Sequence, residues 1–182
     1  MIREKRRSTK VEGHKESKMG EYSHISHTFL PVYDETSELL ILGSFPSVKS
    51  REQGFYYGHP QNRFWKVLAA VYHSEVPQTI EEKKSMLLTN HIAIWDVIDS
   101  CDIIGSSDSS IKNVVPADIA GILSKTKITR IFANGKTAGN LYKKFSEEST
   151  GIRAEVLPST SPANAAFSLE RLVECWGKEL KL

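Results

Sequence analysis

Residues 39–65 read LLILGSFPSVKSREQGFYYGHPQNRFW, and they are the most informative part of the chain. It opens with a continuous apolar run at 39–42, which is typical of a parallel strand buried on both faces. A Gly-Ser-Phe-Pro-Ser turn follows, then three consecutive aromatic residues at 55–57, and Pro60 marks the start of an amphipathic helix. The stretch therefore predicts that a tight turn, an aromatic surface and polar side chains meet at one mouth.

Apolar runs and helical periodicity alternate along the rest of the chain. Three further buried strands are predicted at residues 92–97, 129–133 and 154–157. Helices are predicted at residues 62–72, 79–89, 116–124, 136–145 and 161–180. The second of these helices begins with a capping-box pattern, Thr79 followed by Glu82. This alternation predicts an α/β fold, a three-layer αβα sandwich with a short, mainly parallel four-stranded sheet.

Ligands bind at the carboxyl ends of the strands in such sheets. The loops that follow the four predicted strands carry polar residues and lie at 43–47, 99–113, 134–137 and 158–164. We therefore expect these four loops to converge on one site.

The charge of the chain is uneven. Residues 1–24 carry seven Lys and Arg against four Asp and Glu, and they lack hydrophobic periodicity. We predict a disordered basic tail over 1–24 and a single domain over 25–182, whose net charge is then close to zero. Bulk charge gives no independent indication of nucleic-acid binding by the domain, so contact with DNA would require a local patch.

The composition also limits the setting and the chemistry. The chain has no apolar run long enough to span a membrane and no secretory h-region, so we expect a cytoplasmic protein, or a nuclear one in a eukaryote. Cys101 and Cys175 stand apart and outside any CxxC pattern, which favours two small packing residues over metal ligands. We expect no metal, no cofactor and a monomer.

The turn and helix start carry a family resemblance. The span 43–65 resembles mismatch-specific uracil/thymine-DNA glycosylases without a gap, at Gly43, Pro46, Gly54, Phe55, His59, Pro60, Asn62, Arg63, Phe64 and Trp65. Residues 157–164, LPSTSPAN, resemble the second motif of the uracil-DNA glycosylase superfamily. The resemblance covers about residues 38–175 and implies a DNA glycosylase of the fold predicted above.

The chain departs from these relatives at two positions, and the departure at Phe45 narrows the resemblance to one branch. Phe45 stands where the relatives have an Asn or Asp that handles water, and Leu157 replaces the usual His of the second motif. The hypoxanthine-DNA glycosylase branch also lacks the turn residue, and its pattern implies that Asn62 is catalytic. Asn62 would position water or stabilise the leaving base of deoxyinosine, with no lyase step. Spacing alone makes Asn62 a helix N-cap.

The resemblance also distributes roles around the site. It implies that Tyr57 stacks on an extruded base, although the aromatic run 55–57 could equally pack in the core. The base pocket is predicted to comprise Gly43, Ser44, Phe45, Pro46, Phe55, Tyr57 and His59. Contacts to double- or single-stranded DNA are predicted for Ser47, Lys49, Ser159, Thr160 and Ser161.

For several other polar residues, the sequence leaves more than one role open. A stretch similar to Asp108-Ser109-Ser110 recurs in the hypoxanthine branch, where it either shapes the pocket or forms a solvent loop. Asn134 is interpreted as a turn or cap residue, and His59 as structural or phosphate-facing. No carboxylate neighbours a His in a way that indicates a His/Asp pair.

Two other functions stay open. One is a uracil or mismatched-thymine DNA glycosylase, which Phe45 disfavours. The other is a catalytically inert module that binds damaged DNA, which the two departures favour.

Overall fold

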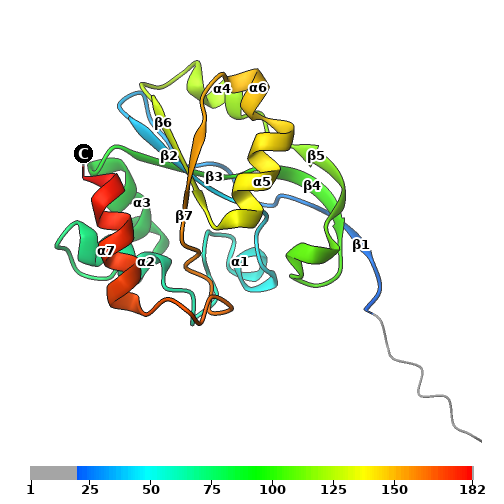
Figure 1. The fold of residues 1–182 in the computed structure, drawn as a ribbon, viewed down its shortest axis with the longest axis horizontal. Coiled ribbons are helices and arrows are strands. Elements are labelled where there is room, and N and C mark those ends of the chain that lie inside the picture. The colour runs from blue at the N-terminus through cyan, green and yellow to red at the C-terminus, as the bar shows by residue number, and fades with distance from the viewer. Residues whose placement is uncertain (1–19, 182) are drawn as a thin grey trace, which may run out of the picture.

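A computed structural model describes residues 20–181, and its centre is a four-stranded parallel sheet (Figure 1). The strands lie in the order β3-β2-β6-β7, and every neighbouring pair is parallel. Their bounds are β2, Leu39–Gly43; β3, Ile92–Asp96; β6, Arg130–Asn134; and β7, Ala154–Leu157. All four strands predicted from the apolar runs are confirmed.

The sheet is covered on both faces, as the continuous apolar runs require. Leu39 and Ile41 of β2 belong to a core that includes Trp65 and Trp176, whereas Leu40 and Leu42 belong to a second core around Tyr142. Because successive strand residues point to opposite faces, these two cores are the two sides of one sheet. The predicted three-layer αβα sandwich is confirmed.

The described part of the chain contains seven α-helices. They are α1, Val48–Gln53; α2, Phe64–Val71; α3, Ile80–Thr89; α4, Ile119–Leu123; α5, Lys136–Phe145; α6, Glu147–Thr150; and α7, Leu169–Leu180. The capping box of α3 is confirmed, because the Thr79 hydroxyl accepts from the Glu82 N–H and the Glu82 carboxylate accepts from the Thr79 N–H.

Several predicted helix starts are too early. The helix predicted from residue 62 begins at Phe64 with Arg63 at its N-cap, and α7 begins at Leu169 rather than at residue 161. The polar segment that precedes α7 is held instead by side-chain contacts described below. Pro116, predicted to start a helix, ends a strand. The short helix α1 was not predicted.

A second, antiparallel sheet was also missed. Its strands lie in the order β1-β4-β5, with β1 at Ser23–Ser26, β4 at Ile98–Ile103 and β5 at Lys112–Pro116. The prediction of a loop at 99–113 is wrong, since this segment forms most of the β4–β5 hairpin, with a 3₁₀ turn, η1, at Asp108–Ser110. The hairpin lies next to the carboxyl ends of the parallel strands and supplies one wall of the site.

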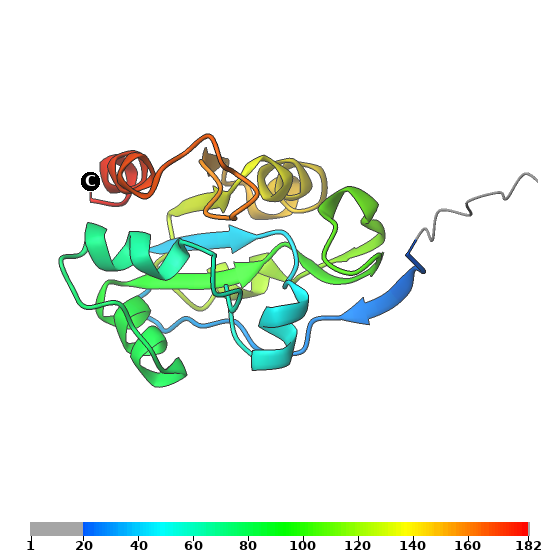
Figure 2. The ribbon, with the colours of Figure 1, turned by 90° about the horizontal axis from the view of Figure 1, so that it is seen from below.

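The first strand corrects the predicted boundary of the tail. Ser23 and His24 pair with Ile103 and Asp102, so two residues assigned to the disordered tail belong to the folded domain. Residues 20–22 of the predicted tail are exposed and precede β1, and residues 1–19 lie outside the described residues. Figure 2 shows β1 at the opposite end of the molecule from α7. Between residues 20 and 181, no helix is long and apolar enough to cross a membrane.

Candidate active site

A cavity of about 340 Å³ lies at the carboxyl ends of the parallel strands. All four loops expected to converge contribute to it. Its lining comprises Gly43, Ser44, Phe45, Pro46, Ser47, Val48, Lys49, Ser50, Tyr56, Tyr57, His59, Asn62, Asp96, Ile103, Ser106, Asp108, Asn134, Ser159, Thr160, Ser161 and Pro162.

The cavity brings together nearly all the residues predicted from the sequence. Phe55 is the exception, because it is 4% exposed and packs in the core against Tyr56 and Trp65. Thr160 lines the cavity but is fully buried, so the structure places it behind the surface that a DNA phosphate would touch. The open alternative for the aromatic run 55–57 is thus resolved as core packing for Phe55.

Asn62 is held in one orientation at the cavity wall. Its Oδ1 accepts hydrogen bonds from the Phe64 N–H at 3.0 Å and from the Thr160 hydroxyl at 2.9 Å. A backbone N–H can only donate, so the atom that faces it must be the amide oxygen rather than the nitrogen. Both acceptor positions of Oδ1 are therefore used, and the NH₂ group is the part of Asn62 left for a ligand.

Asn134 fixes Thr160, which in turn fixes Asn62. The Asn134 Nδ2 donates to the Thr160 hydroxyl at 2.9 Å, and the Thr160 N–H donates to the Asn134 Oδ1 at 3.0 Å. This chain of hydrogen bonds joins the end of β6, the loop after β7 and the start of α2. Asn134 was predicted only as a turn or cap residue, since its partner lies 26 residues away in the sequence.

The side chain of Arg63 holds the same loop by binding the backbone carbonyls of the segment before α7. Its guanidinium donates to the carbonyl oxygens of Thr160 at 3.3 Å, Ser161 at 2.7 Å and Asn164 at 3.0 Å, and also to that of Phe167. A planar group with five N–H donors suits such a cluster of carbonyls. The loop thereby keeps its shape without helical structure, which explains why α7 starts late.

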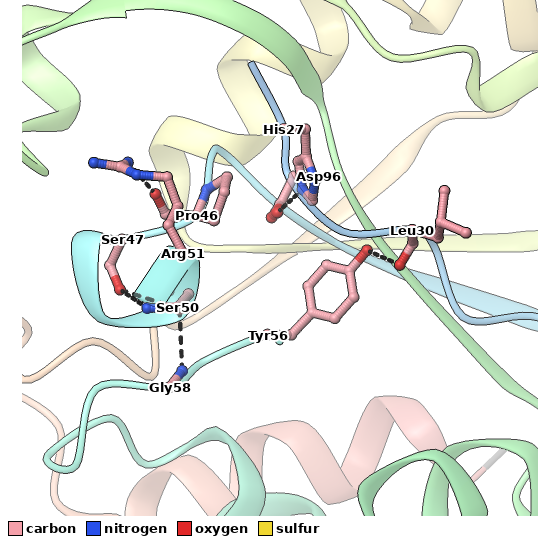
Figure 3. A network of polar contacts seen from close by, with 9 residues as sticks. All are labelled: His27, Leu30, Pro46, Ser47, Ser50, Arg51, Tyr56, Gly58 and Asp96. Atoms are coloured by element: carbon pink, nitrogen blue, oxygen red, sulfur yellow. Dashed lines mark hydrogen bonds and ion pairs between the residues drawn. The ribbon is translucent and has the colours of Figure 1, made fainter. Parts of the chain in front are cut away.

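Figure 3 shows a buried His/Asp pair, of which Asp96 lines the cavity. His27 Nε2 and Asp96 Oδ2 are 2.8 Å apart, and the two side chains are 2% and 6% exposed. The His27 ring stacks on Trp95 with a centroid distance of 5.4 Å. Sequence reasoning missed this pair because 69 residues separate its members. The one available signal was that Asp96 ends an otherwise apolar strand.

Tyr57 is constrained from several sides. Its ring stacks on the Phe64 ring, with 3.9 Å between the ring centroids. Its backbone has a positive φ of 52°, which is unfavourable for a bulky side chain. Its hydroxyl is buried without a hydrogen-bond partner among residues 20–181. Burial, and then the charge of Asp96, raise the pKa of Tyr57, so the phenol stays neutral.

Asp108 adds a second carboxylate at the cavity. The Ser44 hydroxyl lies 3.2 and 3.3 Å from the two carboxylate oxygens of Asp108 and donates to them. Water reaches Asp108, yet desolvation by the surrounding protein raises the pKa of its carboxyl. The hydrogen bond from Ser44 lowers this pKa, and the negative charge of Asp96 raises it further. One of the two alternatives for this segment, a residue that shapes the pocket, therefore fits Asp108.

The aromatic loop is tied to α1. Ser47 caps α1 by accepting from the Ser50 N–H, and the Ser50 hydroxyl accepts from the Gly58 N–H at 3.0 Å (Figure 3). Arg51 donates to the Pro46 carbonyl at 2.8 Å. These contacts hold the turn and the aromatic loop together at the mouth. Within residues 20–181, no three His, Cys, Asp or Glu side chains are grouped to hold a metal ion.

The chain and its fold have clear counterparts among known proteins. Residues 30–178 match the uracil DNA glycosylase superfamily. A protein of Methanosarcina acetivorans named Hypoxanthine DNA glycosylase is 37% identical over 149 residues, which cover 81% of this chain and 93% of that protein. A protein of the same name from Methanosarcina barkeri is 30% identical over 155 residues, or 84% and 96% of the two chains.

A solved structure agrees with these matches. The solution NMR structure of a candidate uracil DNA glycosylase from Methanosarcina acetivorans superposes with a TM-score of 0.72 at 35% identity, and covers 84% of this chain and 94% of that one. This chain belongs to the uracil-DNA glycosylase superfamily. Within it, the similarity to the hypoxanthine branch that the sequence indicated is confirmed by the two proteins of that name.

Proposed function

We propose that this protein is a monofunctional DNA glycosylase that hydrolyses the N-glycosidic bond of deoxyinosine and releases hypoxanthine. Similarity to two proteins named Hypoxanthine DNA glycosylase supports the substrate. The observation that carries the chemistry is the fixed Asn62 amide at the cavity wall, whose oxygen is fully engaged while its NH₂ has no hydrogen-bond partner among residues 20–181.

The proposed reaction begins when the nucleotide leaves the DNA stack and its base enters the cavity. The bond between C1′ and N9 breaks, its electron pair leaves with the base, and the sugar becomes oxocarbenium-like. Asn62 donates a hydrogen bond to the base as this negative charge develops. Water then adds to C1′ and loses a proton, and the base takes up a proton, so that free hypoxanthine and an abasic site result.

The mouth of the cavity suits a DNA backbone. Ser47, Ser159 and Ser161 line it with short hydroxyl side chains. We propose that they and Lys49 contact the phosphates that flank the extruded nucleotide, and that the protein acts as a monomer. Lys49 is exposed and paired with Glu52 at 2.8 Å. A Schiff-base nucleophile needs a desolvated amine, so this pairing favours simple hydrolysis over a lyase step.

The test is single-turnover excision on duplexes that carry one deoxyinosine or one deoxyuridine. Asn62→Ala removes the side chain, and Asn62→Asp keeps the oxygen that contacts Phe64 and Thr160 but replaces the NH₂ donor. We expect both variants to lose about 10²–10³-fold in the rate of hypoxanthine release while still binding DNA. Asn90→Ala, at the end of α3 and outside the cavity, is the matched control and should keep the wild-type rate.

Three outcomes would contradict parts of the proposal. If Asn62→Asp kept or exceeded the wild-type rate, Asn62 would act through its oxygen on water rather than through its NH₂ on the base. If the wild type bound these duplexes tightly and released no base, the protein would be the inert damage-binding module. Faster release of uracil than of hypoxanthine would instead assign the alternative substrate.

A further inference from the structure

We infer that Asp108 is a catalytic residue of this site, which takes up a proton from the water molecule that attacks the sugar. The inference rests on the proposed function and supplies a step that Asn62 does not perform, because a side-chain amide is not a base. Water that adds to C1′ must lose a proton, and a positioned side chain that receives this proton accelerates the reaction.

The cavity offers few groups that can receive a proton. Among the described residues that line it, the candidates are His59, Asp96 and Asp108. The Nδ1 of His59 accepts a hydrogen bond from the Gln61 N–H at 3.2 Å, so the neutral ring carries its hydrogen on Nε2 and has no free lone pair. Asp96 is only 4% exposed, and its Oδ2 is engaged by His27. Asp108 is exposed to water and is therefore the acceptor that remains.

The tip of the β4–β5 hairpin holds Asp108 against the turn after β2. The Ser44 hydroxyl lies 3.2 and 3.3 Å from the two carboxylate oxygens of Asp108, and the Ser44 carbonyl accepts from the Ile98 N–H at 3.2 Å. At the same tip, the Ser106 hydroxyl accepts from the Val48 N–H at 2.8 Å, which joins the hairpin to the start of α1 (Figure 1). The orientation of Asp108 is thus set by the fold, although its segment of the sequence resembles a loop.

Asp108 lies at the depth in the cavity that the sugar would occupy. Its partner Ser44 directly follows the buried strand β2, whereas Ser47, which we propose to contact a phosphate, lies further along the turn. An extruded base passes inward beyond its sugar, and the phosphates stay at the mouth. A carboxylate beside Ser44 therefore faces the sugar rather than the base or the phosphates.

The surroundings of Asp108 suit a general base. Desolvation raises the pKa of its carboxyl, so the ionised form binds a proton more readily than an ordinary aspartate does. The Ser44 hydroxyl supplies one hydrogen to two carboxylate oxygens, which leaves acceptor positions for a water molecule. The negative charge of the carboxylate also stabilises the oxocarbenium-like sugar before water adds.

Proton transfer to Asp108 completes the hydrolysis. The bond between C1′ and N9 breaks first, and its electron pair leaves with the base. The water oxygen then bonds to C1′, and one water proton passes to a carboxylate oxygen of Asp108, which becomes a neutral carboxylic acid. Asp108 later releases this proton to solvent, and the base takes up a proton from solvent. No covalent bond to the protein forms at any stage.

The experiment measures single-turnover base release from duplexes that carry one deoxyinosine or one deoxyuridine. Asp108→Asn keeps an oxygen for the Ser44 hydroxyl but cannot take up the proton, so we expect the rate to fall about 10²-fold. Asp99→Asn removes the same charge from an exposed position of β4 outside the cavity, and this matched control should keep the wild-type rate. Both variants should bind a duplex with non-cleavable 2′-fluorinated deoxyinosine equally well, and melting curves check that each is folded.

A second variant distinguishes a general base from a structural residue. Asp108→Ala opens space beside C1′ for azide, an anion that attacks carbon without losing a proton. We expect azide to raise the rate of base release by Asp108→Ala about tenfold or more, because the missing proton acceptor is no longer needed. The product strand should then carry an azido group on C1′ in place of a hydroxyl, which mass spectrometry detects. Azide should not accelerate wild type, whose carboxylate occupies the position and repels the anion.

The outcomes separate the inference from the proposed function. An unchanged rate in Asp108→Asn would overturn the role of Asp108, and so would a loss of rate that a loss of DNA affinity fully explains. Failure of azide to restore base release by Asp108→Ala would also overturn it, because a residue that only removes a proton is dispensable to azide. Wild-type release of hypoxanthine alongside any of these results would leave the proposed function standing. No base release by wild type from either duplex would remove both.

Discussion

At the scale of single residues, Asn62 shows how one side chain serves structure and chemistry together. Spacing identifies it as a cap, and its oxygen does satisfy an unpaired N–H at the start of α2, although Arg63 occupies the N-cap position. The contact with Thr160, 98 residues away, could not be predicted from spacing. Sequence patterns therefore find the polar residue at the mouth, while its orientation depends on a distant loop.

Tyr57 permits a prediction at the same scale. Its buried hydroxyl has no hydrogen-bond partner, so Tyr57→Phe should raise the free energy of unfolding by about 1 kcal/mol and leave excision unchanged. Tyr57→Ala should weaken binding of the inosine duplex, because the ring that we propose to stack on the base is lost. Urea unfolding and single-turnover assays measure both effects. A tenfold loss of rate in Tyr57→Phe would mean that the hydroxyl contacts the substrate.

At the scale of elements, the strands and helices differ in how far the sequence predicts them. The four parallel strands and the bounds of α5 follow from continuous apolar runs and helical periodicity. The β4–β5 hairpin does not, because polar residues interrupt the apolar positions of β4 and β5 has no buried position, so the segment resembles a loop. The segment before α7 is likewise held by hydrogen bonds from Arg63 and Asn134 rather than by its own local preferences.

Thr160 links the end of β6, the loop after β7 and the start of α2 through its hydrogen bonds, so its replacement tests these contacts together. Thr160→Val keeps the shape but removes the hydroxyl between Asn134 and Asn62, and should lower the free energy of unfolding by about 1–3 kcal/mol. The rate of base release should fall about 10- to 100-fold, because Asn62 is less well positioned. Thr160→Ser, which restores the hydroxyl, should recover most of the rate. Loss of stability with an unchanged rate would limit Thr160 to a structural role.

At the scale of the whole molecule, the cavity gathers negative charge although the protein is proposed to bind DNA. Asp96 and Asp108 both line it, and each disfavours the ionised form of a neighbouring group. Such an arrangement suits a cationic, oxocarbenium-like sugar better than a phosphate, so we expect phosphates to stay at the mouth. Net charge, at +2 for the chain, could not have predicted this separation.

Asp108 connects that charge to the stability of the fold. Its pKa is raised in the folded protein from an ordinary value near 3.8, so the folded state holds a proton that the unfolded chain has already lost. The free energy of unfolding should therefore fall as the pH rises from the ordinary pKa of the carboxyl to its raised pKa in the folded state. Asp108→Asn should melt slightly higher than wild type at neutral pH. The two should melt alike at a pH below the ordinary value, where the carboxyl is protonated in both states. A wild type that melts higher than Asp108→Asn at neutral pH, by a margin that disappears in acid, would show that the folded site favours the ionised carboxylate.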